Sequence, residues 1–375
     1  MRILMMANVP ADPDRGAAGT EVQTARALRL LGHEVDNVWA DDLGRRIQHG
    51  NLHILFELPR AYERAALRAL RTKAYDVVHV NQPHGYRAAK AVHRLAPGTV
   101  FIHRSHGFEL HVEATMARWN AQYGQDRRGI ARRLASRTLA PLLARHSHAI
   151  AREADGHVVS STLDADFLAE RLHVDRAKIA VIPQAAPDGY LRTEPLPMTR
   201  ERLRRVLYVG QFAFVKAPMI VAEAMNRIAA AEPGVSFTWV CDQSHHHAVR
   251  SLLSAPVELL HWTSQEALRA IYDAHGLFLF PSFFEGFGKA FLEAMSRGLC
   301  VVASDAGGMH DLIDHGRNGC LVPPGDAEAV ADAALAIMRD PDRAERMSAA
   351  AIATGREHTW ERVARELTAF YEARR

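Results

Sequence analysis

Two glutamates, Glu285 and Glu293, have the clearest chemical potential in the chain, because seven residues separate them in a segment that also holds Gly286 and Gly288. The apolar run at residues 277–280 predicts a buried strand just before them, and a helical pattern opens near Gly288. The free N–H groups and positive dipole end at the start of such a helix suit a phosphate. The two carboxylates can accept hydrogen bonds from the hydroxyls of a sugar or a ribose.

A plainer interpretation of this segment is a capped helix with a solvated glutamate at each end. That is what an isolated pair of glutamates usually means. The combination of a strand, a glycine-containing loop and the Glu-x7-Glu spacing favours a ligand site instead.

The elements that must position these residues are strands and helices that alternate regularly along the chain. Short apolar runs alternate with longer helical patterns, which is typical of βαβ units around parallel sheets. Strands are expected at residues 2–7, 34–38, 77–80, 99–103, 156–159 and 179–182, and then at 206–209, 236–241, 257–260, 277–280, 301–303 and 319–322. A helix is expected over residues 21–31, ended by Gly32.

A proline-dense stretch between Pro183 and Pro197 interrupts this alternation and is typical of a linker. The sequence therefore predicts an α/β protein with two doubly wound domains of similar size, joined near residue 190. In such sheets ligands bind beyond the carboxyl ends of the strands, so functional residues should follow the strands directly.

The composition excludes several classes of protein. With 48% hydrophobic and 24% charged residues among 375, the chain is neither disordered nor fibrous. A net charge of only +3 gives no reason to expect nucleic acid. Cys241, Cys300 and Cys320 lack paired spacing, which argues against a disulfide framework or a zinc knuckle. No apolar run approaches the ~20 residues of a membrane span, and no signal peptide opens the chain, so the expected location is cytoplasmic.

The small net charge hides an asymmetry. Residues 61–150 hold 15 Lys and Arg against five acids, so this stretch carries +10 and the remainder −7. Within it, five arginines interleave with apolar residues in a helical pattern: Arg127, Arg128, Arg132, Arg133 and Arg137. The favoured interpretation packs the apolar face on the sheet and leaves the arginines at the surface or on an anionic acceptor. Peripheral contact with an anionic membrane, at its inner face, is the alternative.

The segment that carries the two glutamates resembles a known family. Glu285-x7-Glu293, with Pro281-Ser282 before it and Gly286-Phe287-Gly288 inside it, looks like the donor-site signature of retaining GT-B glycosyltransferases of family GT4. The resemblance covers nearly the whole chain and includes residues 301–308, residues 316–326 and Thr359-Trp360-Glu361.

This resemblance implies a GT-B fold, an α/β architecture of two Rossmann-like doubly wound parallel-sheet domains facing a central cleft. Residues 1–190 would form the acceptor-binding domain, residues 191–358 the nucleotide-sugar donor domain, and residues 359–375 a helix that crosses back to the first domain. The implied reaction moves a sugar from a UDP- or GDP-linked donor to a hydroxyl of a carbohydrate, lipid-linked or small-molecule acceptor. We expect the reaction to retain the anomeric configuration and to need neither a metal nor a cofactor besides the co-substrate. The expected setting is bacterial glycan, glycolipid or natural-product biosynthesis.

The resemblance also assigns roles to residues. His106, Lys216 and Glu285 are the expected catalytic residues: His106 orients the sugar and acceptor, Lys216 neutralises the leaving diphosphate, and Glu285 holds sugar hydroxyls. Glu293 would hold the ribose. The full set expected at the donor is Gly19, Gly210, Gln211, Lys216, Glu285, Gly286, Phe287, Gly288, Lys289, Ala290 and Glu293. Gln211 departs from the arginine of the family, which removes one fixed charge and five hydrogen-bond donors.

Three patterns imitate metal sites: the Asp-x-Asp pairs at residues 12–14 and 164–166, and the histidine triplet at 245–247. Adjacent histidines in a polar loop are mostly solvated, and acids at a helix start favour the dipole, so no metal is expected.

Other functions stay open at this point. They are another GT-B reaction, such as that of a nucleotide-sugar epimerase or a phosphorylase, and a nucleotide-sugar-binding protein without transfer activity, which Gln211 motivates. A dinucleotide-dependent dehydrogenase is disfavoured because no GxGxxG follows a strand.

Overall fold

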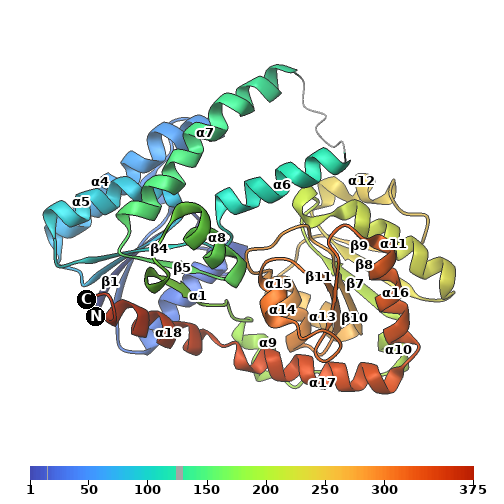
Figure 1. The fold of residues 1–375 in the computed structure, drawn as a ribbon. Coiled ribbons are helices and arrows are strands. Elements are labelled where there is room, and N and C mark those ends of the chain that lie inside the picture. The colour runs from blue at the N-terminus through green and yellow to red at the C-terminus, as the bar shows by residue number, and fades with distance from the viewer. Residues whose placement is uncertain (15, 124–129) are drawn as a thin grey trace. The chain divides into compact units, whose positions relative to one another are not determined.

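The computed structural model describes residues 1–14, 16–123 and 130–375, with only the course of the backbone for residues 130–138. They form two compact units (Figure 1), one of Met1–Pro183 with Trp360–Arg375 and the other of Gln184–Thr359. Within the described residues each unit contains a parallel six-stranded sheet with helices around it. The predicted α/β class with doubly wound sheets is confirmed.

In the first unit the strand order is β2-β1-β3-β4-β5-β6. The strands are β1 (Arg2–Met6), β2 (Glu34–Val38), β3 (Val77–Asn81), β4 (Val100–Arg104), β5 (Gly156–Val159) and β6 (Ile179–Val181). The helices are α1 (Gly16–Leu30), α2 (Ala40–Leu43), α3 (Gly50–Leu52), α4 (Leu58–Thr72), α5 (Tyr86–Leu95), α6 (Glu109–Tyr123), α7 (Ile130–Glu153), α8 (Thr162–Leu172) and α18 (Trp360–Glu372), with short turns η1 (His53–Glu57), η2 (Pro83–Gly85) and η3 (Arg176–Lys178).

In the second unit the strand order is β12-β11-β10-β7-β8-β9. The strands are β7 (Arg205–Val209), β8 (Ser236–Val240), β9 (Val257–Leu260), β10 (Leu277–Phe280), β11 (Cys300–Ser304) and β12 (Cys320–Val322). The helices are α9 (Asp188–Arg192), α10 (Arg200–Leu203), α11 (Pro218–Ala231), α12 (His246–Arg250), α13 (Gln265–Ala274), α14 (Lys289–Ser296), α15 (Gly308–Leu312), α16 (Ala327–Met338) and α17 (Pro341–Glu357), with turns η4 (Phe214–Lys216) and η5 (Gln243–His245).

Each expected strand is present, with its ends within one residue of the prediction. The first helix is different, because α1 begins at Gly16 rather than at residue 21. Ala17 and Ala18 are strong helix formers. Gly19 gives the preceding loop room, since a Cβ on it would lie 2.4 Å from the Pro13 carbonyl oxygen.

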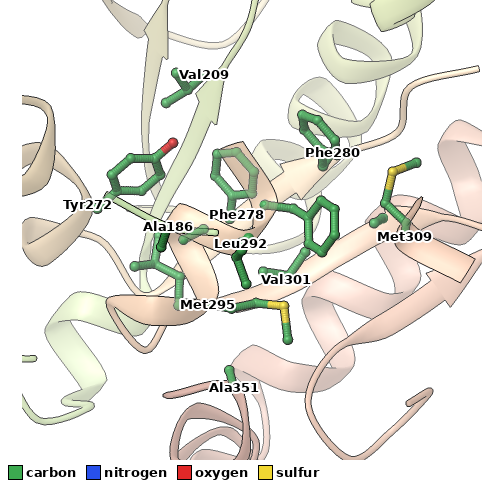
Figure 2. Close-up of a cluster of buried hydrophobic side chains, with 14 of the residues drawn as sticks. Ala186, Val209, Tyr272, Phe278, Phe280, Leu292, Met295, Val301, Met309 and Ala351 are labelled. Atoms are coloured by element: carbon green, nitrogen blue, oxygen red, sulfur yellow. The ribbon is translucent and has the colours of Figure 1, made fainter. Parts of the chain in front are cut away.

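The apolar face of the second sheet packs against α14 (Figure 2). Phe278 and Phe280 of β10 and Val301 of β11 lie against Leu292 and Met295 of α14, all with at most 1% of their surface exposed. Burying a side chain of this size contributes about 1.5–3 kcal/mol. This packing fixes α14 at the carboxyl end of β10, the position from which a helix start can meet a ligand.

The same core extends to the residues that lead into the second unit. Ala186 and Tyr190 lie in the second unit's core, and that unit begins at Gln184, several residues before the expected residue 191. The carbonyl oxygens of Tyr190 and Thr193 each accept a 2.7 Å hydrogen bond from the buried Arg297. The proline-dense stretch is therefore anchored to the second unit rather than loose.

The C-terminal helix α18 belongs to the first unit, where it packs beside α1 (Figure 1). The Tyr371 hydroxyl forms a hydrogen bond with His79 Nδ1 of β3. A second bond joins Thr368 Oγ1 to His33 Nε2 at 2.8 Å.

Some composition-based expectations concern residues that the structure describes only in part. Arg127 and Arg128 lie outside the described residues, as do the side chains of Arg132, Arg133 and Arg137. In the described part of the chain, no helix combines the length and the apolar content that crossing a bilayer requires. The three cysteines are free thiols and buried.

Candidate active site

The loops that follow β7 and β10 meet where the strand order of the second sheet reverses. The Phe283 N–H donates to the Val215 carbonyl oxygen at 2.9 Å. The rings of Phe214 and Phe283 lie 5.1 Å apart. Parallel α/β sheets bind ligands where the strand order reverses. The donor candidates after residue 209 and after residue 280 therefore lie together at the carboxyl ends of β7 and β10.

Lys216 and Glu285 are joined at this edge by an ion pair between Nζ and Oε1. The Lys216 Nζ also lies 5.6 Å from the centre of the Phe280 ring. Glu285 is 9% exposed, so little water screens the pair. The two expected catalytic residues of this unit therefore neutralise each other's charge.

The loop that carries Glu285 is held by two glycines from the neighbouring strand end. Gly307 has φ +56°, and a Cβ on it would lie 1.6 Å from the Glu285 carbonyl oxygen. The Gly308 N–H donates to that same oxygen at 3.2 Å. Because there is no room for a side chain at Gly307, the backbone of the Glu285 loop can pack directly against it.

Gly288 provides the start of α14. Its φ of +88° is left-handed, which favours glycine, and a Cβ on it would lie 2.9 Å from the Phe280 ring. Lys289 and Ala290, which open the helix, are partly exposed, whereas Gly286 and Phe287 before it are buried. The Phe287 ring packs on Phe291 in the core, so only its backbone is placed to meet a ligand.

The remaining donor candidates after β7 differ in exposure. Gly210 is buried, and a Cβ on it would lie 2.5 Å from the Tyr208 hydroxyl. Gln211 is exposed. Gln211 therefore occupies the family's arginine position as a solvated side chain.

Glu293 lies in the second turn of α14 and is 5% exposed. The Tyr272 hydroxyl donates to its Oε2 at 3.1 Å. Burial raises the pKa of the Glu293 carboxyl, although the nearby Lys289 charge and the bond from Tyr272 oppose this rise. Its expected contact with a ribose remains a prediction.

In the first unit, His106 follows β4 and its Nε2 donates to Glu21 Oε1 at 2.7 Å. The Asn81 amide donates to the same oxygen at 3.2 Å. Burial opposes ionisation of Glu21, yet the bond from His106 and the charge of Arg104 lower the pKa of this carboxyl to about 2. Glu21 is therefore a buried anion that holds His106 in place.

Glu21 was not predicted, although the sequence contains a signal for it. It shares one helical stripe with Ala25 and Leu28, so it is an acid on the face of α1 that packs on the sheet. Gly19, expected at the donor, lies in the first turn of the same helix and faces Pro13 of its own loop.

Three buried hydroxyls near the second site were also missed. They belong to Tyr208 of β7, Ser282 after β10 and Ser304 at the end of β11, and none of them has a hydrogen-bond partner among the described residues. Tyr208 and Ser304 lie on strands and Ser282 follows one, and two of these strands, β7 and β10, meet at the reversal point. The Glu285 charge adds to burial in raising the pKa of the Tyr208 hydroxyl.

The patterns that imitate metal sites have other contacts. Asp164 accepts hydrogen bonds from the Phe108 N–H and from His111. The ring of His245 stacks on that of Phe212 at 5.3 Å. Among the residues that the structure describes, no group of three or more His, Cys, Asp or Glu side chains is placed to hold a metal ion.

Comparison with protein-family models covers both halves of the chain. Residues 15–187 match the model described as Glycosyltransferase Family 4. Residues 204–340 match the model described as Glycosyl transferases group 1. The second match contains Lys216, Glu285 and Glu293, and the first contains Glu21 and His106.

The relatives are consistent with these matches. A D-inositol 3-phosphate glycosyltransferase of Nocardia farcinica is 28% identical over 242 residues, which are 60% of this chain and 54% of that protein. The chain thus aligns with about half the length of this curated relative.

Two solved structures share the fold over the full chain. A sucrose-phosphate synthase from Thermosynechococcus elongatus has a TM-score of 0.76 at 22% identity and covers 100% of this chain and 99% of its own. An Anabaena protein in complex with UDP and glucose has a TM-score of 0.68 at 17% identity, with 98% of each chain covered. The fold is therefore GT-B, and the chain belongs to the GT4-like, group 1 family of glycosyltransferases.

Proposed function

We propose that this protein moves a sugar from a nucleotide diphosphate sugar to an acceptor hydroxyl, with retention of the anomeric configuration and without a metal ion. The observation that carries the proposal is the Lys216–Glu285 ion pair beside the start of α14, at the point where the strand order reverses.

Departure of the diphosphate builds negative charge on its oxygens. Fixed positive groups aimed at that charge stabilise the transition state. Lys216 supplies a full charge, and the N–H groups at Lys289 and Ala290 supply the positive end of the α14 dipole. Together they take the place of a divalent cation.

Donor binding changes the partner of each member of the pair. The diphosphate replaces Glu285 as the partner of Lys216, and the released carboxylate accepts hydrogen bonds from the sugar hydroxyls. The buried orphan hydroxyl of Ser282 lies on the same loop and is available to the ligand. Lys216 thus exchanges one anionic partner for another, and the Glu285 carboxylate keeps hydrogen-bond donors, which limits the cost of its burial.

The acceptor belongs to the first unit in this proposal. His106, held by the Glu21 anion, orients the sugar and the acceptor hydroxyl. The leaving phosphate takes the hydroxyl proton on the face from which it departs, which retains the configuration. The Anabaena neighbour was solved with UDP and glucose, which supports a nucleotide sugar as the class of donor.

A panel of UDP-, GDP- and ADP-sugars, each with and without acceptors, tests the proposal. Release of nucleotide that depends on the acceptor, with an α-linked product from an α-linked donor by NMR, is the expected result. Activity should persist after exhaustive chelation. Loss of activity on chelation would contradict the metal-free reaction.

A second candidate function is nucleotide-sugar binding without transfer. The observation that favours it is Gln211, an exposed neutral side chain where the family has an arginine. Calorimetric binding of a donor with no turnover over the whole acceptor panel would support this function and exclude the first.

A further inference from the structure

A pocket of about 190 Å³ lies in the first unit between the end of α2 and one face of α4. Four arginines line it: Arg45, Arg46, Arg64 and Arg68. Two carboxylates line it as well, those of Asp42 and Glu57. The charged lining is therefore net positive.

The two carboxylates already accept hydrogen bonds from groups other than the arginine side chains of the pocket. Asp42 Oδ2 accepts the Trp39 N–H at 2.8 Å. Glu57 accepts the N–H groups of Arg46 and Ile47, each at 2.9 Å, and a bond from His53 Nδ1 at 2.8 Å. The bond from His53, together with these N–H groups, lowers the pKa of Glu57 to about 2. Neither carboxylate pairs with an arginine side chain of the pocket.

The four arginines, in contrast, outnumber the two carboxylates of the lining. Arg64 and Arg68 are exposed and lie one turn apart on α4, where like charges repel. In the described part of the chain, the guanidinium groups of Arg46, Arg64 and Arg68 form no hydrogen bond or ion pair. The guanidinium group of Arg45 donates to the carbonyl oxygens of Ile47 and Gln48. An anion bound between Arg64 and Arg68 would reduce their mutual repulsion.

The place of the pocket in the fold also fits a ligand. Strand β2 ends at Val38, and α2 follows after one residue, so the pocket lies beyond the carboxyl end of a strand of the first sheet. Two large apolar side chains in the segment that leads into α4 are exposed, Leu52 by 38% and Phe56 by 50%. They offer an apolar surface close in sequence to the cationic pocket.

We propose that this pocket binds a phosphate group, carried either by a soluble phosphate ester or by the headgroup of an anionic lipid. A guanidinium group presents paired N–H donors that match two phosphate oxygens, and several such groups around one cavity neutralise a dianion. The unit that contains the pocket is the one expected to bind the acceptor, so the ligand would be an acidic acceptor or the surface on which the acceptor resides. The binding does not depend on sugar transfer, so its failure is distinguishable from failure of the proposed function.

The test uses the full chain and two pairs of substitutions. The double variant Arg64→Gln/Arg68→Gln removes two charges from the pocket. The control Arg71→Gln/Arg94→Gln removes two exposed charges from α4 and α5 without touching the lining. Because all four side chains are exposed, thermal unfolding should confirm that both variants fold like the wild type.

Two probes distinguish the sources of the phosphate. The first is inorganic phosphate, titrated by calorimetry at low ionic strength; the difference between wild type and variant isolates the pocket from any binding at Lys216. The second is flotation with phosphatidylcholine vesicles that contain phosphatidylglycerol, against vesicles of phosphatidylcholine alone.

A loss of about tenfold in affinity for inorganic phosphate in the pocket variant, with the control pair within about twofold of wild type, supports a soluble ester. Loss of flotation in the pocket variant alone supports the lipid source. Equal losses in both pairs would show diffuse surface charge and overturn the proposal. Absence of binding to either probe by the wild type would overturn it as well.

Discussion

Lys216 and Glu285, 69 residues apart in the chain, form an ion pair that joins the loop after β7 to the loop after β10. Each is an expected catalytic residue, and each neutralises the charge of the other. The pair therefore keeps two partly buried charges neutralised and in position.

The first prediction concerns this pair. Lys216→Ala and Glu285→Gln should each lower kcat for sugar transfer by about 10²–10³, the range for removing one charge-stabilising group from an active site. The double variant should lose less than the product of the two single effects, because both residues act on one ligand. Initial rates with a saturating donor measure this.

The matched control is the Arg227–Glu223 pair on α11, which is exposed and bridged at 3.1 Å. Arg227→Ala and Glu223→Gln should leave the rate unchanged, because exposed pairs contribute little. Wild-type rates in Lys216→Ala and Glu285→Gln would remove the site assignment.

The second prediction concerns Gly307, whose Cβ would overlap the Glu285 carbonyl oxygen. Gly307→Ala should displace the Glu285 loop and lower transfer by at least about tenfold, since misplaced catalytic groups lose their effect. Gly316→Ala is the control: Gly316 has φ +83° but open space around it, so it carries the backbone strain without the clash. Equal activities in the two variants would show that the clash does not move Glu285.

The third prediction concerns Gln211. Gln211→Arg should tighten binding of a nucleoside diphosphate by about tenfold, the order expected for one charge-assisted hydrogen bond. Calorimetric titration of UDP and GDP measures it, with Gln243→Arg as a control in another polar segment of the same unit. No gain in affinity would show that Gln211 does not face the diphosphate.

The fourth prediction concerns Arg297, which is 1% exposed and forms a 2.7 Å ion pair with Asp273. It also donates to the backbone carbonyl oxygens of Tyr190 and Thr193, in the proline-dense stretch that leads into the second unit. Arg297→Met should lower the free energy of unfolding by about 2–3 kcal/mol, because buried Asp273 loses one of its two arginine partners among the described residues and keeps the 3.1 Å bond from Arg269. Urea denaturation measures the change. Arg227→Met, on the surface, should cost less than about 0.5 kcal/mol, and similar costs for both would contradict the anchoring role.

The fifth prediction is that stability falls on acidification, because of buried histidines in the first unit. Burial lowers the pKa of His79 and of His84 to about 3 and that of His157 to about 4. Below pH 6.5 the unfolded chain binds protons that these folded side chains do not, so stability is full above pH 6.5 and is lost as pH falls towards their folded pKa values.

At pH 5 the loss should reach as much as about 2 kcal/mol for each such histidine. Urea denaturation at pH 7.5 and pH 5.0 measures it, and His157→Gln should reduce the difference if the variant folds. A free energy of unfolding that does not change between these pH values would contradict the prediction.

The strands could be predicted closely because their signal is local. The run at residues 277–280, for example, is apolar throughout and ends at Pro281. The start of α1 was missed because glycines at residues 16 and 19 suggested a turn, whereas packing of the loop at Pro13 against Gly19 decides the helix start.

The site could be predicted only in part. Resemblance selected Lys216, Glu285 and His106, but the partners of these residues are set by the tertiary fold. Glu21 reaches Asn81 and His106, which lie 60 and 85 residues further along the chain. A local sequence pattern cannot predict contacts over such sequence separations. The hydrogen bond between the buried Glu21 carboxylate and His106 is therefore visible only in the folded structure.

The central claim is that the Lys216–Glu285 site transfers sugar from a nucleotide diphosphate sugar. Acceptor-dependent nucleotide release by the wild type and by Lys216→Ala/Glu285→Gln, measured side by side over the donor panel, tests it most directly. We expect release by the wild type with at least one donor and a rate at least about 10²-fold lower in the double variant. Equal release by both proteins would contradict it.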